Sequence, residues 1–349
     1  MIQKTIKKDI RKLSLEELEK ELTAAGEKRF RAKQIYEWLW RKSAVSFDEM
    51  TNLSLKTREW LKDAFEIQTL EIDQRQDSAD GTAKYSFVMA DGSLVEGVLI
   101  PAENRITACI SSQVGCSLSC KFCATGYLER KRNLEAGEIY DQVVLINKQA
   151  VEIFGKPLSN IVYMGMGEPL LNYANVLKSI EHITSPEGLG MAARRITLST
   201  AGIAKMIRKL GDDNVKFNLA LSLHAADDEK RNQIMPINES NNLAALKEAL
   251  IYFYGKTKNK ITLEYIAFKN FNDSLADAAA LARFSKNIPC KVNIIEYNPI
   301  GQAGFMKSDE GAIEAFKSYL EDKGLVVNIR RSRGKDIDAA CGQLAGKKA

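Results

Sequence analysis

The sequence predicts an α/β fold in which parallel strands and helices build an open, partial barrel. From residue 105 onward, apolar strand-like runs alternate with amphipathic helical patterns, as in parallel sheets with right-handed crossovers. Six such βα units and a final strand are present, fewer than the eight that close a TIM barrel. Chemically unusual residues follow five of these strands directly. We therefore expect a TIM-like partial barrel with a pocket at the carboxyl ends of its strands.

The predicted barrel occupies residues 105–331. Its expected strands are the runs ITACISS, NIVYMG, RITLST, KFNLALSLH, KITLEYIAF, KVNIIEYNP and LVVNIRR. Helices are expected over residues 135–149, 172–183, 202–210, 227–255 (in two pieces), 274–287 and 308–322. The missing wall of such a barrel could admit a large substrate.

The segments before the barrel differ in period. Residues 1–67 predict a basic helical accessory domain, in which Ser14 and Glu17 have the spacing of a capping box and Ser54 is a candidate N-cap. Basic helices with exposed aromatic residues suit RNA, although a solvated helical bundle explains the same pattern. Residues 68–104 predict a small β extension, with a hairpin at Asp91-Gly92. Residues 332–349 form a C-terminal tail.

Composition narrows the class of protein. The 349 residues are 45% hydrophobic and 27% charged with a net charge of +5, which is ordinary for a folded protein and compatible with a nucleic-acid partner. No apolar run is long enough to span a bilayer, and the N-terminus does not resemble a secretory signal. The cysteines, at positions 109, 116, 120, 123, 290 and 341, do not suggest a secreted disulfide framework. We expect a cytoplasmic, monomeric protein without a membrane partner.

Three cysteines stand in one loop after the first barrel strand, in the run GCSLSCKFCATG. Cys116, Cys120 and Cys123 supply three thiolates, and neither a fourth cysteine nor a histidine lies near them in sequence. A four-iron cluster takes one thiolate per iron, so three ligands would leave one iron open for another molecule. A zinc site and surface thiols are the alternatives. The position of the loop at the barrel mouth favours the cluster.

The pattern Cys-x3-Cys-x-aromatic-Cys resembles the signature of the radical S-adenosylmethionine (SAM) superfamily, and MGMGEPLLN at 164–172 resembles its glycine-rich loop. The resemblance implies a radical SAM barrel holding a [4Fe–4S] cluster, whose open iron binds SAM and whose electron cleaves it to a 5′-deoxyadenosyl radical. Further stretches are similar to the adenine-C2 RNA methyltransferases of that superfamily and span nearly the whole chain. They are VEGVLIP, ITLSTAG, LALSLHA, RNQIMPIN, YNPI and DIDAACGQL.

This resemblance assigns roles that the residues alone do not. It implies that Cys341 accepts a methyl group from one SAM and carries it to adenine C2 after a second SAM is cleaved. It implies that Cys109 resolves the covalent adduct through a transient disulfide with Cys341, and that Glu96 is the base for the C2 proton. Read alone, the two cysteines are core or idle thiols and Glu96 faces solvent. The SAM contacts implied are Gly167, Glu168, Ser199, Ser222, Leu223, His224 and Asn298.

Basic runs at 130–132, 194–195 and 330–335 are candidate phosphate contacts around the barrel mouth. The expected partners are 23S ribosomal RNA, transfer RNA and an electron donor such as flavodoxin or ferredoxin. His182 and Cys290 match no motif and are expected to be structural. Two alternatives remain: methylation of adenine C8 in ribosomal RNA, which confers antibiotic resistance, and a non-catalytic RNA-binding protein with a structural metal. Pro169, which follows Glu168, resembles the C2 group and favours that activity.

Overall fold

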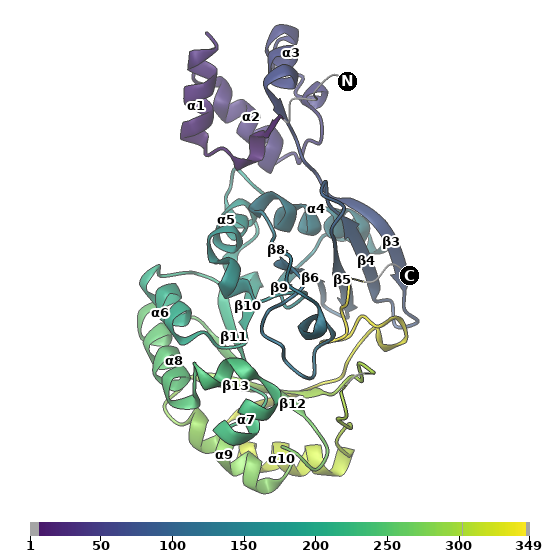
Figure 1. Cartoon of the computed structure of the whole chain (residues 1–349), viewed down its shortest axis with the longest axis vertical. Helices are drawn as coiled ribbons and strands as arrows, with labels where there is room; N and C mark the ends of the chain where they lie inside the picture. Colours follow the sequence, from purple (N-terminus) through teal and green to yellow (C-terminus); the bar gives the residue numbers. More distant parts are fainter. Residues whose placement is uncertain (1–6, 302, 347–349) are drawn as a thin grey trace.

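The protein is built around an open, 10-stranded sheet (Figure 1). The computed structural model describes residues 7–301 and 303–346, so residues 1–6 of the predicted helical domain and 347–349 of the predicted tail lie outside it. The strand order is β14-β13-β12-β11-β10-β9-β6-β5-β4-β3. Strands β6 and β9 to β14 are parallel, and helices connect them, as predicted. The α/β partial-barrel prediction is therefore confirmed.

The observed elements differ from the predicted ones by a few residues at their ends. The strands of the large sheet are β3 (Glu71–Asp77), β4 (Ala83–Val88), β5 (Leu94–Ala102), β6 (Arg105–Cys109), β9 (Asn160–Tyr163), β10 (Ile196–Thr200), β11 (Asn218–Ser222), β12 (Ile261–Ala267), β13 (Cys290–Glu296) and β14 (Val326–Arg330). The barrel helices are α4 (Ala136–Phe154), α5 (Tyr173–Thr184), α6 (Ala204–Asp212), α7 (Asp228–Ile234), α8 (Leu243–Thr257), α9 (Leu275–Ser285) and α10 (Glu310–Asp322). Within the described part of the chain, every helix is too short or too polar to cross a membrane.

Alternate residues of the barrel strands serve different faces. In β12 every residue is buried, because helices cover one face and the barrel interior lies on the other. Leu263 and Tyr265 pack into the main hydrophobic core, whereas Thr262 and Glu264 line an interior cavity. The apolar pattern therefore predicts the outer layer, and the polar residues between mark the interior.

The β extension continues the barrel sheet. Strand β5 pairs antiparallel with β6 and with β4, and Gly92, at φ +76°, lies in the turn between β4 and β5 as predicted. The sequence analysis missed β3, which pairs with β4. Its sequence EIDQRQD is polar because β3 is an edge strand whose residues alternate between exposed and half-buried.

The N-terminal helices form a module at one end of the molecule (Figure 1). They are α1 (Leu15–Ala24), α2 (Arg31–Trp40) and α3 (Leu55–Ala64). Ser14 and Glu17 make the predicted capping box, and Ser54 caps α3 by accepting from the Thr57 N–H. A two-stranded pair, β1 (Lys8–Asp9) and β2 (Phe65–Glu66), joins the ends of the module.

A buried aromatic cluster ties this module to the barrel. Trp40 is 1% exposed and therefore does not offer its ring to an RNA base. Its ring stacks on His182 of α5, with ring centroids 3.6 Å apart and planes 4° apart, and its carbonyl accepts from the Tyr140 hydroxyl. Nearby, Arg11 forms a buried ion pair with Asp141 of α4 at 2.7 Å. His182 is thus structural, as expected.

Burial, assisted by the charges of Lys178 and Arg11, lowers the pKa of His182 from 6.5 to about 3. Below pH 6.5 the unfolded chain therefore binds a proton at His182 that the folded chain does not bind. The contribution of neutral His182 to the free energy of unfolding is complete above pH 6.5 and is lost as the pH falls below that value. Between pH 7 and pH 5 we expect the free energy of unfolding to fall by about 2 kcal/mol less in His182→Phe than in the wild type, because phenylalanine has no group to protonate. Urea unfolding at both pH values checks this. An equal loss in both proteins would contradict it.

Candidate active site

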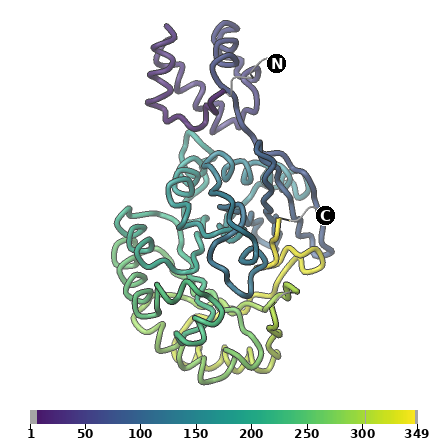
Figure 2. Tube along the Cα trace, in the orientation of Figure 1, coloured from purple at the N-terminus to yellow at the C-terminus, as the bar shows by residue number. Residues whose placement is uncertain are grey.

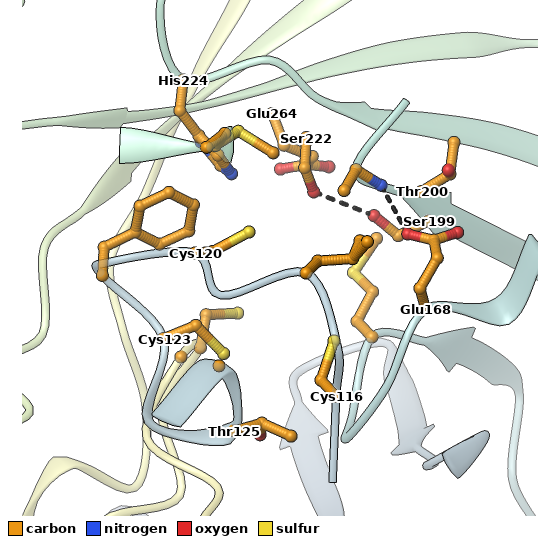
Figure 3. A pocket seen from close by; sticks show the side chains of 18 of the residues that line it. Cys116, Cys120, Cys123, Thr125, Glu168, Ser199, Thr200, Ser222, His224 and Glu264 are labelled. Carbon is orange, nitrogen blue, oxygen red and sulfur yellow. Dashed lines mark hydrogen bonds between the residues drawn. The ribbon is translucent and has the colours of Figure 1, made fainter. Parts of the chain in front are cut away.

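The three predicted cysteines line one cavity of about 150 Å³ at the carboxyl ends of the strands (Figure 3). Their loop follows β6 and is closed at its base by the antiparallel pair β7 (Gln113–Val114) and β8 (Arg132–Asn133). The Lys121 N–H donates to the Ile234 carbonyl at 3.0 Å, which fixes the loop against α7. The Phe122 ring lies edge-on to His224, 4.6 Å away, and shields the cavity. The chain thus gathers three thiols in a partly enclosed site.

The donor chemistry of this site fits an iron–sulfur cluster. Burial raises the pKa of Cys120, and the charges of Cys123 and Cys116 raise it further, so three thiolates together need a bound cation. Within residues 7–301 and 303–346, no three His, Cys, Asp or Glu side chains form a group that could hold a single metal ion. A four-iron cluster takes one thiolate per iron. The three thiols of this loop therefore fit the ligands that such a cluster needs, with one iron left open.

A glycine-rich turn after β9 forms a second wall. Gly167 has φ +93°, and a Cβ there would lie 2.5 Å from the Gln113 Cβ. Next to it, Glu168 is buried and accepts from the Leu170 and Ala201 N–H groups at 3.0 and 2.7 Å. Burial raises the pKa of Glu168, and these two donors oppose the rise. This fixed carboxylate lines the cavity and suits a cationic ammonium group.

Alanine at Gly167 combines a strained backbone with a collision. We expect Gly167→Ala to lower the unfolding free energy by about 1–3 kcal/mol and to weaken SAM binding at least about tenfold. Thermal unfolding and equilibrium dialysis with SAM measure the two effects. Gly92→Ala is the matched control, because Gly92 has φ +76° but nothing within 4 Å of its added Cβ. Equal SAM affinity in the two variants would contradict the expected role of Gly167 in SAM binding.

The next strand ends supply polar groups to the same cavity. Ser199 of β10 and Ser222 of β11 have their hydroxyls 3.4 Å apart (Figure 3). The Nδ1 atom of His224 accepts from the Ile266 N–H at 3.1 Å, and burial lowers its pKa to about 3, so the ring is neutral. Of the described residues, Leu223 and Asn298 lie outside the cavity wall. The structure therefore brings most, but not all, of the predicted SAM contacts to the cavity.

The C-terminal tail, yellow in Figure 2, runs beside the three-cysteine loop, and its Cys341 lines the same cavity as the three cysteines. The Gly342 carbonyl accepts from the Ala124 N–H at 2.6 Å, and the Thr125 hydroxyl donates to the Leu344 carbonyl at 2.6 Å. The Asn298 amide donates to the Cys341 carbonyl at 3.3 Å. Asn298 thus acts on the tail in this structure, while Cys341 itself lines the cavity.

Cys109, at the end of β6, opens onto a second cavity of about 940 Å³ that Cys341 also lines. Burial raises the pKa of Cys109 to about 12, and the neighbouring Cys341 adds to the rise. Cys341 is exposed. The protein around its thiol nevertheless raises the pKa of Cys341, and the positive charge of Arg330 opposes that rise. Both are free thiols here, so the predicted disulfide is not formed in this structure. They nevertheless share one chamber.

Glu96 occupies a different environment from the one expected of a lone strand carboxylate. It is 4% exposed, and its Oε2 accepts from the Ala345 and Gly346 N–H groups at 2.8 and 3.0 Å. Lys84 lies 3.6 Å from its other oxygen. In the part of the chain that the structure describes, Glu96 lines neither of the two cavities. In this structure Glu96 anchors the tail that bears Cys341.

Sequence reasoning missed a buried arginine beneath the site. Arg231 of α7 is fully buried and donates to the Leu223, Ser222 and Ala201 carbonyls and to the Asn238 side chain. It thereby holds the ends of two strands and of the following turn in one arrangement. The stretch RNQIMPIN carries Arg231, but a cation inside a polar helix gives no sign of burial.

The basic runs divide into two groups. Arg194 and Arg195 are exposed and line the larger cavity. Arg330 and Arg331 also line it, but they form ion pairs with Glu264 and Glu310. Arg132 forms ion pairs with Glu138 and Asp91, and its phosphate contact stays a prediction. Lys335 likewise forms an ion pair with Glu296. Neutralised cations of this kind brace the fold.

Comparison with known proteins places the site in a family. The model of the ribosomal RNA large subunit methyltransferase N-terminal domain matches residues 8–67, and that of the radical SAM superfamily matches residues 110–282. The probable dual-specificity RNA methyltransferase RlmN of Cytophaga hutchinsonii is 65% identical over 341 residues, covering 98% of this chain and 93% of the relative. The chain belongs to the RlmN family of radical SAM RNA methyltransferases.

Two further proteins support this family membership. The dual-specificity RNA methyltransferase RlmN of Geobacter sulfurreducens is 45% identical, covering 97% of this chain and 92% of the relative. The crystal structure of a radical SAM methyltransferase from Sphaerobacter thermophilus has a TM-score of 0.91 and 39% identity, covering 97% of this chain and 100% of that one. Membership of the superfamily implies a [4Fe–4S] cluster and SAM.

Proposed function

We propose that this protein methylates C2 of adenine in 23S ribosomal RNA and in transfer RNA, consuming two SAM molecules per turnover. One observation carries the proposal: Cys341 lines the cavity of the three-cysteine loop and also shares the larger chamber with Cys109. A methyl carrier needs to reach SAM on one side and a substrate on the other. The relatives are named dual-specificity RNA methyltransferases, and the matching N-terminal model is that of a ribosomal RNA large subunit methyltransferase, which supports a ribosomal RNA substrate and a second substrate specificity.

We propose that Cys116, Cys120 and Cys123 bind three irons of the cluster and leave the fourth for SAM. The bound cluster would supply the electron that cleaves SAM reductively. Gly167 and Glu168 hold the SAM amino group, since the Glu168 carboxylate is fixed at the cavity wall. The remaining SAM contacts are proposed to be Ser199, Ser222, Leu223, His224 and Asn298. Leu223 and Asn298 would act from behind the wall.

The substrate chemistry then rests on residues of the tail and of β5 and β6. Cys341 as thiolate takes a methyl group from SAM by displacement, and the Asn298 contact fixes the backbone of Cys341. The 5′-deoxyadenosyl group of the second SAM would take a hydrogen atom from that methyl group, so that its carbon can bond to adenine C2. The one electron left over once the C2 proton has gone would return to the cluster, which supplied an electron to cleave that SAM. Glu96 removes the C2 proton, for which it has to release the tail N–H groups it now holds. The Cys109 thiolate then attacks the Cys341 sulfur and breaks its bond to the product carbon, which takes up a proton to become the methyl group. The two cysteines are left as a transient disulfide.

The remaining proposals concern partners and setting. Residues 1–67 dock RNA, residues 68–104 form the β extension, residues 105–331 form the catalytic barrel, and residues 332–349 deliver Cys341. The protein acts as a monomer in the cytoplasm, where free thiols persist. A flavodoxin or ferredoxin reduces the cluster.

The identity of the methylated nucleoside tests this function. Purified ribosomal and transfer RNA are incubated with reduced protein and SAM, digested to nucleosides and analysed by mass spectrometry, with nuclease mapping of the site. We expect 2-methyladenosine. A major product of 8-methyladenosine would favour the C8 activity, and zinc without 5′-deoxyadenosine formation would favour the metal-containing RNA-binding protein.

A further inference from the structure

The interior of the barrel is a polar chamber. The cavity of about 940 Å³ falls in the size range of small-molecule sites, although it lies inside a barrel. Short polar side chains of the parallel strands line it: Thr107, Asn160, Thr197, Asn218, Thr262, Asn293 and Asn328. Apolar packing normally fills such an interior. Here the strands leave room and supply donors and acceptors, which suits a flat, polar heterocycle.

Charge is distributed unevenly along the chamber. Glu264 is the one carboxylate among the described residues of its wall. The other charged residues of that wall are Arg105, Arg194, Arg195, Lys260, Lys291, Arg330, Arg331 and Arg333. Five of these cations lie at or just before strand starts, namely Arg105, Arg194, Arg195, Lys260 and Lys291, whereas Arg330, Arg331 and Arg333 lie at the carboxyl end of β14. The only carboxylate of this wall among the described residues, Glu264, lies beside Arg330 and also lines the three-cysteine cavity. The chamber thus offers cations at the strand starts and a carboxylate near Cys341, which suits a nucleotide with its phosphate outside and its base inside.

Glu264 has an unused hydrogen-bonding oxygen. The residue is 4% exposed, and its Oε1 accepts from the Asn293 amide at 2.9 Å, while the Asn328 amide donates to Asn293 Oδ1 at 3.3 Å. Its Oε2 is buried and has no hydrogen-bond partner within the described structure. The Arg330 guanidinium lies 3.6 Å away, at ion-pair distance only. A buried acceptor left unsatisfied costs free energy, unless a ligand supplies the donor.

We propose that Glu264 is the specificity-determining residue of the RNA site, accepting a hydrogen bond from the exocyclic amino group of the extruded target adenine. The inference rests on the proposed function. Glu264, labelled in Figure 3, lines the same two cavities as Cys341. The amino group and C2 of adenine belong to the same six-membered ring, so one base can face both residues. Guanine and hypoxanthine carry an oxygen at the amino position, which the carboxylate repels.

The test exchanges the hydrogen-bond donor on the base and the acceptor at position 264 together. The oligoribonucleotide containing the site that the wild type methylates is synthesised with adenosine, inosine or purine riboside at that position. The wild type is expected to prefer adenosine over both analogues in kcat/KM. In Glu264→Gln the amide can donate to the inosine oxygen, so the adenosine-to-inosine ratio is expected to fall at least about tenfold. Asn293→Ala, which frees the carboxylate from its orienting donor, is expected to lower the same ratio less.

Two controls separate this role from others. Glu296→Gln makes the same change in a buried carboxylate of β13 that faces Lys307 and Lys335 instead of the chamber, and it is expected to keep the wild-type ratio. Mass spectrometry of Cys341 methylation without RNA reports SAM binding and folding, and it should be unchanged in Glu264→Gln. An unchanged ratio, or lost Cys341 methylation, in Glu264→Gln would overturn the inference. Wild-type protein that methylates no adenosine at all would instead overturn the proposed function.

Discussion

Replacing Cys341 with alanine is expected to abolish methylation of RNA, with a loss of several orders of magnitude. The methyl group has no other carrier on this account, because direct transfer from SAM to an aromatic carbon lacks a nucleophile at C2. The side chain lines the cavity wall and is not a core residue, so the variant should fold and still bind iron. Radioactive methyl transfer to RNA measures the loss.

Cys290→Ala is the matched control for that experiment. Cys290 lies at the start of β13, outside the two cavity walls, and burial raises its pKa to about 11, so it is an inert thiol. We expect it to retain near-wild-type methylation. If Cys341→Ala methylated RNA at the rate of Cys290→Ala, the methyl-carrier role of Cys341 would be wrong even though the family is right.

The second large effect concerns the three-cysteine loop. Cys120→Ala is expected to reduce bound iron severely and to eliminate 5′-deoxyadenosine formation, because two thiolates do not retain the cluster against solvent. Phe122 of this loop packs against Phe268, and the Lys121 backbone contact to α7 does not depend on the thiol, so the barrel itself should stay folded. Iron analysis and the visible spectrum after anaerobic reconstitution give the first readout, and assay of 5′-deoxyadenosine gives the second.

Cys109→Ala is the matched control for Cys120→Ala, because it tests whether the loss of any thiol near the cavities removes the iron. It removes a buried thiol beside the same chamber but no proposed ligand, so iron content and SAM cleavage should remain near wild type. Wild-type iron in Cys120→Ala, or stoichiometric zinc in the wild type, would show that the loop does not hold the expected cluster.

Much of the fold follows from local patterns in the sequence. The barrel strands are apolar runs and their helices have one apolar face, so both kinds of element are visible without tertiary information. Ser14 and Ser54 were identifiable as caps for the same reason, since capping depends on residues three positions apart. Edge strand β3 was missed because half-buried edge positions need no apolar side chains.

The candidate site was only partly predictable. Motif resemblance supplies the cysteines, Glu168 and the two serines, but it does not give the contacts that orient them. Arg231 was missed because its partners are mainly backbone carbonyls, which leave no mark on side-chain pattern. Glu264 was missed because its acceptor role depends on strand register, which sets it beside Asn293. Nor does sequence position reveal that Glu96 holds the tail.

Isotope transfer from SAM with a fully deuterated methyl group tests the central claim most directly. If the methyl group passes through Cys341 and loses a hydrogen atom there, 5′-deoxyadenosine gains one deuterium and the methyladenosine keeps two. Direct displacement by the base would leave three deuterium atoms in the product and none in 5′-deoxyadenosine. Mass spectrometry of both molecules from one reaction distinguishes the two results. The first supports the account, and the second contradicts it.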